Sequence, residues 1–543
     1  MHPQKTPKFI VVTGGVLSGL GKGIATASIG NLLSRQFNII PVKCDGYLNV
    51  DPGTMNPVEH GEVFVLDDGT EVDMDFGHYE RFLGVTCKGK WNLTMGKVFE
   101  KIRDKERRGD YLGKTVQMIP HVTNLIKEHF FEIANEENAE IVLIEIGGTV
   151  GDVENELYIE AARELKKDAG RENVLYVHLT YIPKPSGVDE QKSKPTQQSV
   201  NLLREKGIQP DIIIGRCAEF LTDKIKEKIA TFCDVEASAV ISGIDVDNIY
   251  KIPAIFEKQG ILGIISKKLG ITIEPHNEEW NRLANNIDPF GKDITIAICG
   301  KYTALKDSYA SIAEALNHCS AHTGYKINFK WVETSETEEY NENEFKELLN
   351  GAHAVIVPGG FGSRGVEGKI KAIRYCRENK IPYLGICYGM QLAVVEFARN
   401  VCGLEKANTT EVDPSTLHPV ICILPEKKNL QNMGGTLRLG ACTAHLTPGS
   451  VMHRTYADST NSERHRHRYE VNPEYHDILT KNGMVLCGMS PDRKLVEFIE
   501  LPESAHPYFV GCQGHIELKS TLLKPAPLFL GLVKAAIELK DKK

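Results

Sequence analysis

The chain has 543 residues, which is too many for one ordinary hydrophobic core and predicts about two to four domains. Hydrophobic residues make up 41% of the composition, and no apolar run approaches the roughly 20 residues that a membrane-spanning helix needs, so we expect no membrane partner. A net charge of −8 argues against broad nucleic-acid binding, and the 13 cysteines never form a Cys-x-x-Cys pair, which favours neither a disulfide framework nor a zinc site. We therefore expect a cytoplasmic protein that acts on small molecules.

The first predicted elements are a strand at residues 9–13, a glycine-rich loop and a helix at residues 23–36. The loop begins at Gly15 and ends in Gly21-Lys22-Gly23. Glycines let backbone N–H groups approach phosphate oxygens, the helix N-terminus adds positive potential, and the lysine supplies a full charge. The pattern therefore predicts a polyphosphate site, although a ligand-free glycine turn has the same sequence features. Gly23 stands where the standard loop has Ser or Thr, so a metal ion would need carboxylates from elsewhere.

Two acidic stretches are candidates for that metal site. Asp73 and Asp75 lie close together in the sequence, and Glu145 lies at the end of an apolar strand predicted at residues 141–146. Open α/β sheets bind ligands at the carboxyl ends of their strands, and Mg²⁺ takes few protein carboxylates together with phosphate oxygens and water. Solvated surface carboxylates are the alternative interpretation.

Residues 190–197 concentrate hydrogen-bond donors and cations in a predicted loop. Such a loop is suited to clamp a second nucleoside triphosphate, because its cations can face phosphate oxygens. A solvated turn is the alternative interpretation of the same residues.

Strands alternate with helices through both halves of the chain, which predicts parallel sheets wrapped by helices. Residues 276–292 contain Asn, Glu, Pro and Gly and predict a linker between the halves. We therefore predict an α/β fold of two doubly wound parallel-sheet domains, at residues 1–275 and 293–543. Other expected elements are a helix at residues 158–167 and strands at residues 212–215, 294–299, 354–357 and 383–386.

Cys387 is the candidate nucleophile of the second domain. In the run Gly385-Ile386-Cys387-Tyr388-Gly389 it lies between a predicted strand and a helix at residues 390–398, which is the nucleophile-elbow pattern with Cys in place of Ser. The flanking glycines permit the strained turn that exposes the sulfur, and the helix N-terminus favours the thiolate. A buried structural cysteine is the alternative interpretation.

His515 and Glu517 are the candidate partners of this thiol. Their period-two spacing places them on one face of an extended segment, so that Glu517 orients the imidazole that activates Cys387. Residues 358–362, Pro-Gly-Gly-Phe-Gly, follow another strand and offer backbone N–H groups for an oxyanion hole. Residues 463–470 alternate Arg and His and predict a half-exposed strand ladder, with one arginine able to bind a substrate carboxylate; a metal or RNA site is the alternative.

Taken together, these residues resemble the CTP synthase family along nearly the whole chain. The resemblance implies that ATP phosphorylates O4 of UTP and that ammonia displaces the phosphate to give CTP. It also implies that the ammonia comes from glutamine hydrolysis at Cys387 and passes through an internal channel with His60 near its synthetase end. The similar stretches are residues 13–23, 49–54, 60–64, 77–82, 106–113, 146–152 and 192–197 in a P-loop-like synthetase domain, followed after Gly300-Lys301-Tyr302 by a class I glutamine amidotransferase domain.

The resemblance also assigns residues, here by number. The ATP site would contain Ser18, Gly19, Leu20, Gly21, Lys22, Gly23, Asp75, Arg216, Asp245 and Val246, and Asp75 with Glu145 would bind Mg²⁺. The UTP site, which CTP would occupy as an inhibitor, would contain Ser18, Asp152, Val153, Glu154, Lys192, Ser193, Lys194, Pro195, Thr196, Gln197 and Lys228. Glutamine would be held by Gly360, Tyr388, Gly389, Met390, Gln391, Glu411 and Arg468, beside a catalytic triad of Cys387, His515 and Glu517. GTP would activate the glutaminase through residues 364–368, and the protein would be a homotetramer.

The sequence departs from the family pattern at a few positions. Family members usually have Cys-Gln-x-His-Pro-Glu around the catalytic histidine, whereas this chain has Gly514 before His515 and Ile516 in place of the proline. We expect these two residues to loosen the backbone and lower the efficiency of the glutaminase. Gly46 stands where a proline is usual, and residues 155–158 are atypical for the family. We expect these departures to affect feedback inhibition by CTP.

Two other functions remain compatible with parts of the pattern. One is another ATP-dependent amidotransferase with a related first domain, such as a cobyrinic acid amide synthase, which residues 77–82 and 192–197 disfavour. The other is a nucleotide-switched scaffold without net synthesis, which an intact set of Cys387, His515 and Glu517 disfavours.

Overall fold

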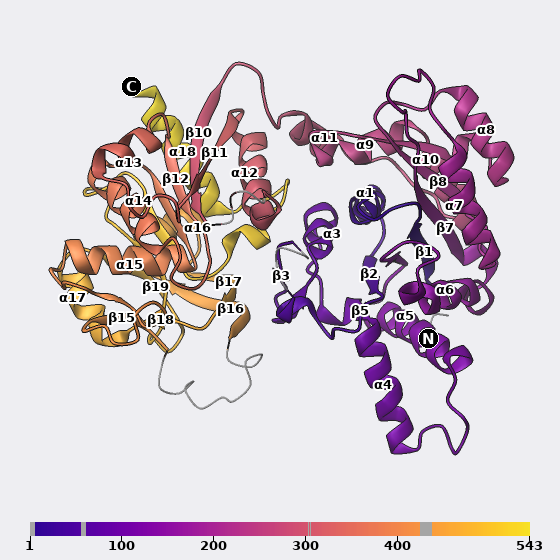
Figure 1. The fold of residues 1–543 in the computed structure, drawn as a ribbon, viewed down its shortest axis with the longest axis horizontal. Coiled ribbons are helices and arrows are strands. Elements are labelled where there is room, and N and C mark those ends of the chain that lie inside the picture. Colours follow the sequence, from indigo (N-terminus) through magenta and orange to yellow (C-terminus); the bar gives the residue numbers. More distant parts are fainter. Residues whose placement is uncertain (1–5, 56–60, 302, 304–305, 424–436, 543) are drawn as a thin grey trace. The chain divides into compact units, whose positions relative to one another are not determined.

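The computed structural model describes residues 6–55, 61–301, 303, 306–423 and 437–542 (Figure 1). The chain folds into two compact units, one of Met1–Pro52 with Asp75–Ala284 and the other of Gly53–Met74 with Asn285–Lys543. The boundaries predicted from the sequence stay a prediction. Two observations bear on them: residues 61–74 pack within the second unit, and helix α11 (Glu278–Asn285) occupies part of the predicted linker.

The first unit is built on a seven-stranded parallel sheet with the strand order β5-β2-β6-β1-β7-β8-β9. All residues of β6 are buried and nearly all are apolar, as expected for a central parallel strand with both faces covered. The strands are β1 (Lys8–Gly14), β2 (Ile39–Asp45), β5 (Asn92–Thr94), β6 (Ile141–Ile146), β7 (Val174–Tyr181), β8 (Ile212–Cys217) and β9 (Val240–Ile244).

Ten helices of the first unit are described. They lie on both faces of the sheet, and α4 extends away from it (Figure 1). The helices are α1 (Lys22–Ser34), α3 (Asp75–Leu83), α4 (Met95–Arg108), α5 (Thr123–Glu136), α6 (Glu156–Ala169), α7 (Lys194–Glu205), α8 (Asp223–Cys233), α9 (Ile252–Lys258), α10 (Ile261–Leu269) and α11.

The second unit contains a nine-stranded mixed sheet with the order β11-β10-β12-β13-β21-β20-β19-β16-β17. Five strands, from β11 to β21, are parallel, and the other four continue the sheet with antiparallel pairs. The strands are β10 (Asp293–Gly300), β11 (Lys326–Glu333), β12 (Ala354–Val357), β13 (Tyr383–Ile386), β16 (Arg438–Leu446), β17 (Thr460–His467), β19 (Val485–Met489), β20 (Val496–Glu500) and β21 (Phe509–Cys512).

Helices cover both faces of the parallel part of this sheet. Val355 packs in one hydrophobic cluster with α14 and α15, and its neighbour Ile356 packs in the other with α12 and α18, because successive strand residues point to opposite faces. The helices are α12 (Ala310–Thr323), α13 (Glu342–Leu349), α14 (Val366–Asn379), α15 (Tyr388–Asn400), α16 (Val451–Tyr456), α17 (His476–Lys481) and α18 (Pro527–Asp541). Two small sheets complete the unit: β14 (Asn408–Thr409), β15 (Pro419–Cys422) and β18 (Glu470–Val471), and the hairpin of β3 (Phe64–Val65) and β4 (Glu71–Val72).

The predicted α/β class is confirmed for both units, with one refinement in the second. Its sheet is mixed and not wholly parallel, because connections such as the six residues between β19 and β20 are too short for the crossover that a parallel pair requires.

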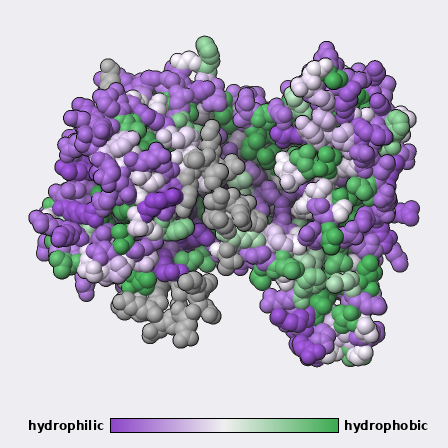
Figure 2. All heavy atoms as spheres, viewed as in Figure 1, coloured by the Kyte–Doolittle hydropathy of each residue, from purple (hydrophilic) through white to green (hydrophobic). Residues whose placement is uncertain are grey.

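The surface agrees with the composition. The face drawn in Figure 2 is mostly hydrophilic, with hydrophobic side chains scattered over both units. Within the described ranges, no helix is both long enough and apolar enough to cross a membrane.

Candidate functional site

The loop between β1 and α1 has the shape of a phosphate cradle. Gly21 precedes α1 with a φ of +84°, which favours glycine, and Lys22 Nζ donates to the carbonyl oxygen of Gly148 at 2.8 Å. A Cβ added to Gly23 would lie 1.9 Å from Asp75 Oδ1. The glycine after the lysine therefore makes room for a carboxylate, in the place where the standard loop offers a hydroxyl.

Asp75 and Glu145 are brought together by Lys43, which the sequence reasoning missed. The Lys43 ammonium pairs with Asp75 and lies 2.7 Å from Glu145 Oε1, while the Tyr79 hydroxyl donates to Glu145 Oε2 at 2.5 Å. Lys43 and Glu145 are register partners on β2 and β6, so the sheet itself fixes this contact. The available signal was a lysine in a buried strand whose first four residues are apolar, and a buried lysine is rare unless its charge is paired.

Burial and pairing act in opposite directions in this cluster. Burial raises the pKa of Glu145, and the Lys43 ammonium works against that rise. Burial also opposes the charge on Lys43, but the carboxylates of Asp75 and Glu145 raise its pKa well above the ordinary value. The cluster is therefore a buried charged network in which the lysine compensates two carboxylates.

The donor set fits a magnesium ion that shares its coordination with phosphate. No group of three or more His, Cys, Asp or Glu side chains in the described residues could hold a metal by itself. Asp75 and Glu145 supply hard carboxylate oxygens beside the glycine loop, and Mg²⁺ is usually bound by one or two carboxylates together with substrate phosphates and water.

Arg216 and Asp245 lie near the same loop. Arg216 Nε is 2.5 Å from Asp245 Oδ1 at the carboxyl ends of β8 and β9, and Val246 follows directly. A Cβ on Gly21 would lie 3.2 Å from the Arg216 guanidinium. A small pocket beside them is lined mainly by apolar side chains, among them Leu20 and Phe256, and such a wall suits the flat face of a base.

The predicted loop at residues 190–197 is only partly a loop. Helix α7 begins at Lys194 with Pro195 in its first turn, where the fixed φ of proline is favourable. Lys192 pairs with Glu190 at 2.8 Å, and the exposed Lys228 acts on the same carboxylate. The side chains of Ser193, Thr196 and Gln197 are turned into the protein, where Thr196 Oγ1 bonds Thr180 Oγ1 at 2.6 Å and Gln197 donates to Ser193 at 3.0 Å.

Asp152, Val153 and Glu154 lie in the loop after β6. Asp152 accepts a hydrogen bond from the Thr149 N–H at 2.9 Å, and Val153 is 83% exposed. A Cβ at Gly46 would lie 2.7 Å from both the Cβ and the carbonyl oxygen of Glu154. The departure at Gly46 therefore has a packing reason, because the loops after β2 and β6 touch there.

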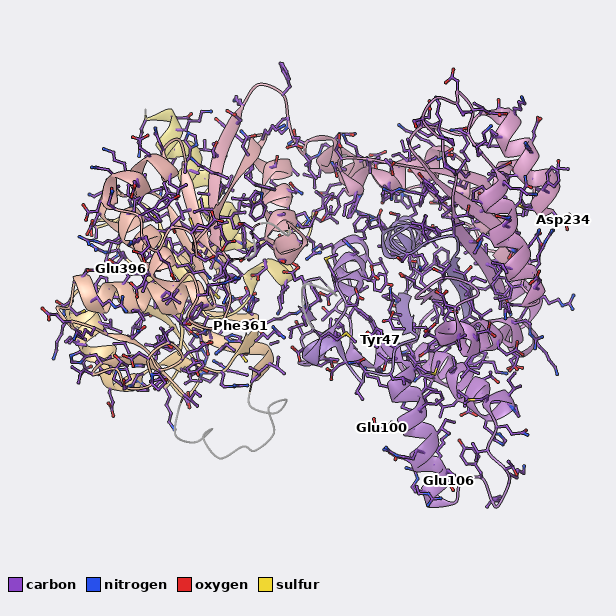
Figure 3. All side chains as sticks on the ribbon, viewed as in Figure 1. Tyr47, Glu100, Glu106, Asp234, Phe361 and Glu396 are labelled. Atoms are coloured by element: carbon purple, nitrogen blue, oxygen red, sulfur yellow. The ribbon has the colours of Figure 1, made fainter. Side chains whose placement is uncertain are left out.

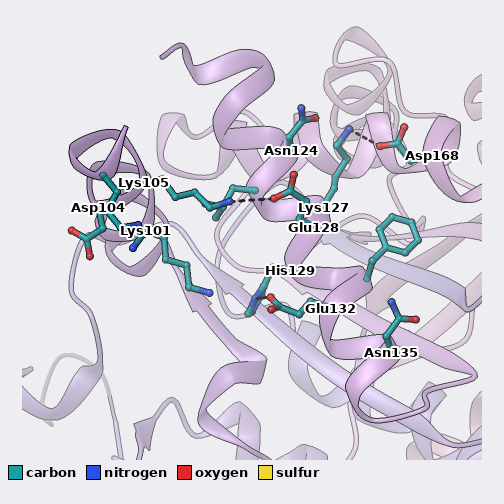
Figure 4. Close-up of a pocket in the computed structure, with 13 residues that line it drawn as sticks. Lys101, Asp104, Lys105, Asn124, Lys127, Glu128, His129, Glu132, Asn135 and Asp168 are labelled. Atoms are coloured by element: carbon teal, nitrogen blue, oxygen red, sulfur yellow. Dashed lines mark hydrogen bonds and ion pairs between the residues drawn. The ribbon is translucent and has the colours of Figure 1, made fainter. Parts of the chain in front are cut away.

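Another cavity of the first unit lies between α4 and α5 (Figure 4). None of the residues predicted for nucleotide binding lines it. Two of its lysines are paired with neighbouring carboxylates: Lys127 with Asp168 at 2.6 Å, and Lys105 with Glu128 at 3.5 Å. We assign no function to it.

Cys387 lies on a strained elbow between β13 and α15. Its φ of +50° and ψ of −102° are unusual for a residue with a side chain, and its N–H donates to the carbonyl oxygen of Cys512 at 2.7 Å. A Cβ on Gly389 would lie 2.0 Å from the carbonyl oxygen of Val357, and one on Gly385 would lie 2.9 Å from the Gly389 backbone. Both flanking glycines are therefore required by close packing.

His515 and Glu517 are in contact, but the segment that carries them is not extended. His515 Nδ1 lies 2.7 Å from Glu517 Oε1, and Glu517 belongs to a short 3-10 helix, Ile516–Lys519. The prediction of an extended segment was wrong because spacing alone does not determine the backbone. Here His515 lies at the position before the helix, and the Glu517 side chain turns back to contact its imidazole.

The imidazole of His515 also faces Cys387. Gly359 lies between them, since an added Cβ would be 3.0 Å from His515 Cε1 and 3.7 Å from Cys387 Cβ. Burial opposes a charge on His515, but Glu517 and Cys387 raise its pKa well above the usual value. This arrangement favours an imidazolium next to the sulfur.

A cavity in the second unit opens over Cys387 and His515. Phe361, labelled in Figure 3, lines it and is 58% exposed. Of the residues predicted to hold glutamine, Gly360, Tyr388, Gln391, Glu411 and Arg468 line the cavity, whereas the side chain of Met390 packs in the core and Gly389 packs against Val357. Those two positions can reach a ligand only through their backbone.

Two buried lysines beside this cavity were not anticipated. Lys369 Nζ lies 3.4 Å from the carbonyl oxygen of Pro358 and 5.4 Å from the centre of the Tyr388 ring. Burial lowers the pKa of Lys369 to about 7, and burial also lowers the pKa of Lys301, whose ammonium bonds the carbonyl oxygen of Phe361. Both lysines therefore donate to backbone carbonyl oxygens of the turn at residues 358–362 and hold it in place.

The predicted Arg-His ladder is a strand only as far as His467, and it is less exposed than expected. It forms the end of β17, where Arg464, His465 and His467 are buried. The reason is that the β3–β4 hairpin lies against it and pairs Asp67 with Arg464. Arg468 follows the strand and lines the cavity.

A cysteine elbow with a His–Glu pair in one α/β unit, and a glycine loop beside buried carboxylates in the other, are the features expected of a nucleotide-dependent glutamine amidotransferase. A family model described as "CTP synthase N-terminus" matches residues 8–271, and one described as "Glutamine amidotransferase class-I" matches residues 304–535. The chain belongs to the CTP synthase family, whose members are ligases.

Similar proteins include two that match along almost their whole length. A CTP synthase of Borreliella burgdorferi is 52% identical over 98% of this chain and 100% of its own, and a CTP synthase of Methanococcus maripaludis is 51% identical over the same shares. The solved glutaminase domain of Trypanosoma brucei CTPS with bound acivicin is 36% identical, covers 45% of this chain and 94% of its own, and has a TM-score of 0.43.

Proposed function

We propose that the protein converts UTP to CTP with ATP and with ammonia released from L-glutamine. The observation that carries this proposal is the presence of both halves in one chain of the family: Cys387 with His515 and Glu517 in the second unit, and the glycine loop with Asp75 and Glu145 in the first. A chain with only one of these sites would supply or use ammonia, but not both.

The glutaminase reaction follows from the geometry around Cys387. The thiolate attacks the carboxamide carbon of glutamine, and backbone N–H groups of the turn at residues 358–362 stabilise the oxyanion. His515, held by Glu517, gives its proton to the departing ammonia and then takes a proton from the water that hydrolyses the γ-glutamyl thioester. Glutamate leaves, and the thiolate and imidazolium are restored. Glu411 and Arg468, on the wall of the cavity, are suited to the charged end of glutamine.

The synthetase reaction belongs to the first unit. Lys22 and the loop N–H groups would hold the ATP phosphates, with Arg216, Asp245 and Val246 around the base. Asp75 and Glu145 would hold Mg²⁺, whose chemistry there is the neutralisation of phosphate charge. The γ-phosphoryl group passes to O4 of UTP, ammonia attacks C4, and inorganic phosphate leaves.

UTP would lie beside Asp152, Glu154 and the start of α7, with Lys192 and Lys228 facing its phosphates. CTP would compete for this site as an inhibitor. GTP activation at residues 364–368, a homotetramer, a cytoplasmic location and an ammonia channel complete the proposal by family resemblance; His60, expected near one end of the channel, lies outside the described residues.

The test is an absorbance assay of CTP formation from UTP, ATP and Mg²⁺, run in parallel with glutamine plus GTP and with ammonium. We expect CTP from both nitrogen sources. CTP from ammonium alone would remove the glutaminase half of the proposal. A folded protein that makes no CTP from either source would contradict the synthetase assignment, and turnover of ATP without CTP would favour a different acceptor or a nucleotide-switched scaffold.

Replacing Gly514 with alanine is expected to lower glutamine-dependent CTP formation and to leave the ammonium-dependent reaction intact. The predicted loosening of the backbone at Gly514 stays a prediction, but the position is closely packed: a Cβ would lie 2.8 Å from Glu463 Cβ and 3.1 Å from the carbonyl oxygen of Arg464. The added methyl group would push the His515 segment away from β17, at a cost of about 1–3 kcal/mol. Steady-state rates with each nitrogen source and the melting temperature check this, and an unchanged glutaminase rate would contradict it.

A further inference from the structure

Residues 61–74, which we call the hairpin arm, lie in the part of the sequence that matches the N-terminal family model, but they pack within the second unit. The arm contains β3, a turn at Asp67 and β4. Its contacts with the second unit include Glu62, which accepts hydrogen bonds from the N–H and the hydroxyl of Ser311 at 3.0 and 2.6 Å. Since the arm ends one peptide bond before Asp75, it joins the predicted nucleotide site covalently to the second unit.

The turn of the arm is held against strand β17 by an ion pair between the half-buried Asp67 and a buried arginine. Asp67 Oδ1 lies 2.5 Å from Arg464 Nε, and the Arg464 side chain is 2% exposed. The guanidinium also lies over the Phe64 ring at 5.3 Å, and the backbone carbonyl of Asp67 accepts the N–H of Ala441 at 2.9 Å. Burial raises the pKa of the Asp67 carboxyl, but Arg464 and Lys519 outweigh it and hold the pKa below its usual value, so the carboxylate is charged when it makes these contacts.

The same carboxylate reaches the second element that carries the candidate catalytic pair. Lys519 Nζ lies 3.5 Å from Asp67 Oδ1 and donates to the carbonyl oxygen of Ser462 on β17 at 2.8 Å. Lys519 ends the 3-10 helix that contains Glu517, and the N–H of His515 donates to the carbonyl oxygen of Arg464 at 2.7 Å. Asp67 therefore contacts two residues next to the His515–Glu517 pair. One is Arg464, whose carbonyl oxygen accepts the His515 N–H, and the other is Lys519, two residues after Glu517.

We propose that Asp67 is a positioning residue for the glutaminase, which holds β17 and the Ile516–Lys519 helix in the register that keeps His515 and Glu517 in place. The inference rests on the proposed function, because it needs His515 to act on Cys387. Asp67 touches neither of them; it acts through Arg464 and Lys519. A shift of about 1 Å at a catalytic group lowers the rate by up to about a hundredfold, so loss of this contact is expected to slow glutamine hydrolysis strongly.

The experiment compares Asp67→Asn with wild type in the full-length protein. We expect kcat for glutamine hydrolysis to fall about 10- to 100-fold, with KM for glutamine changed by less than about threefold because Glu411 and Arg468 are untouched. CTP formation from ammonium is expected to stay near the wild-type rate. Asp67→Glu, which keeps the charge, is expected to recover part of the lost kcat, and such recovery would not follow if only the bulk of the turn mattered.

Asp68→Asn is the matched control, because it makes the same change in charge at the next residue of the turn. The Asp68 side chain is exposed and accepts a hydrogen bond from the Thr70 N–H, which asparagine can also accept. Lys519→Met removes the second cation that pairs with Asp67, and it is expected to lower kcat for glutamine hydrolysis by a smaller factor. This second variant decides the question if Asp67→Asn does not fold.

The inference is overturned if Asp67→Asn hydrolyses glutamine as fast as wild type, or if the loss is in KM and not in kcat. Equal losses with glutamine and with ammonium would also overturn it, because they would indicate general damage. Failure of the proposed function is a separate result: in that case wild type itself releases no ammonia from glutamine.

Discussion

Cys387→Ala is expected to abolish CTP formation from glutamine and to leave CTP formation from ammonium near the wild-type rate. The substitution removes the only atom that attacks the carboxamide in the proposed mechanism, and loss of a nucleophile typically lowers kcat by about 10³-fold or more. The ammonium reaction needs only the first unit's site, which shares no residue with the elbow. The assay follows CTP by absorbance at saturating UTP and ATP, once with each nitrogen source.

Cys402→Ala is the control for this variant. Cys402 is a half-buried cysteine whose sulfur contacts the carbonyl oxygen of Ile478, away from the cavity over Cys387. Both reactions should continue in the control. Glutamine-dependent synthesis that survives in Cys387→Ala would assign the nucleophile to another group, and loss of the ammonium reaction would indicate that the elbow supports more than hydrolysis.

Local signals in the sequence predicted much of the fold. The strands at residues 141–146, 354–357 and 383–386 have the bounds observed for β6, β12 and β13, because a central parallel strand is a continuous apolar run. The helices at residues 23–36 and 158–167 correspond to α1 and α6 within two residues at each end. The antiparallel half of the second sheet was not predicted, since the pairing of β16 to β20 depends on connection lengths and not on the apolar pattern.

The candidate site was predictable where its functional residues lie close together in one short stretch of sequence. Glycines on both sides of Cys387 indicate an elbow, and the structure gives the reason: both positions touch backbone atoms that no Cβ could approach. Contacts between distant segments left no such pattern. Lys43 meets Glu145 across 102 residues and Asp67 meets Arg464 across 397, and a pairing of this kind follows only from the sheet register and the path of the chain.

Gly23 and Gly514 show how a departure from a familiar pattern becomes interpretable in three dimensions. From the sequence, Gly23 means that a metal ligand is missing from the loop, and Gly514 is expected to loosen the backbone before His515. In the structure, Gly23 admits the Asp75 carboxylate to the phosphate loop, and Gly514 lets the His515 segment lie against β17. At each position the missing side chain leaves room for another segment to pack, and the sequence alone does not predict which segment that is.

Lys43→Met is expected to destabilise the metal-free protein by about 3–5 kcal/mol, because it leaves two carboxylates at a buried site without their cation. For a unit of this size that corresponds to a fall of roughly 10 °C in the melting temperature. Mg²⁺ with ATP should restore more stability to Lys43→Met than it adds to wild type, since in wild type the Lys43 ammonium already compensates Asp75 and Glu145. The measurement is thermal unfolding in EDTA and in Mg²⁺ with ATP.

Lys88→Met provides the comparison for this prediction. Its ammonium pairs with Glu137 at 2.7 Å on the surface, where a lost ion pair costs about 1 kcal/mol or less, so its melting temperature should change little in either buffer. If Lys43→Met melts like Lys88→Met in EDTA, the buried network does not stabilise the fold as argued. If Lys43→Met is destabilised but Mg²⁺ with ATP gives it no extra protection, then Asp75 and Glu145 are a structural ion cluster, and the metal of the synthetase reaction must be held elsewhere.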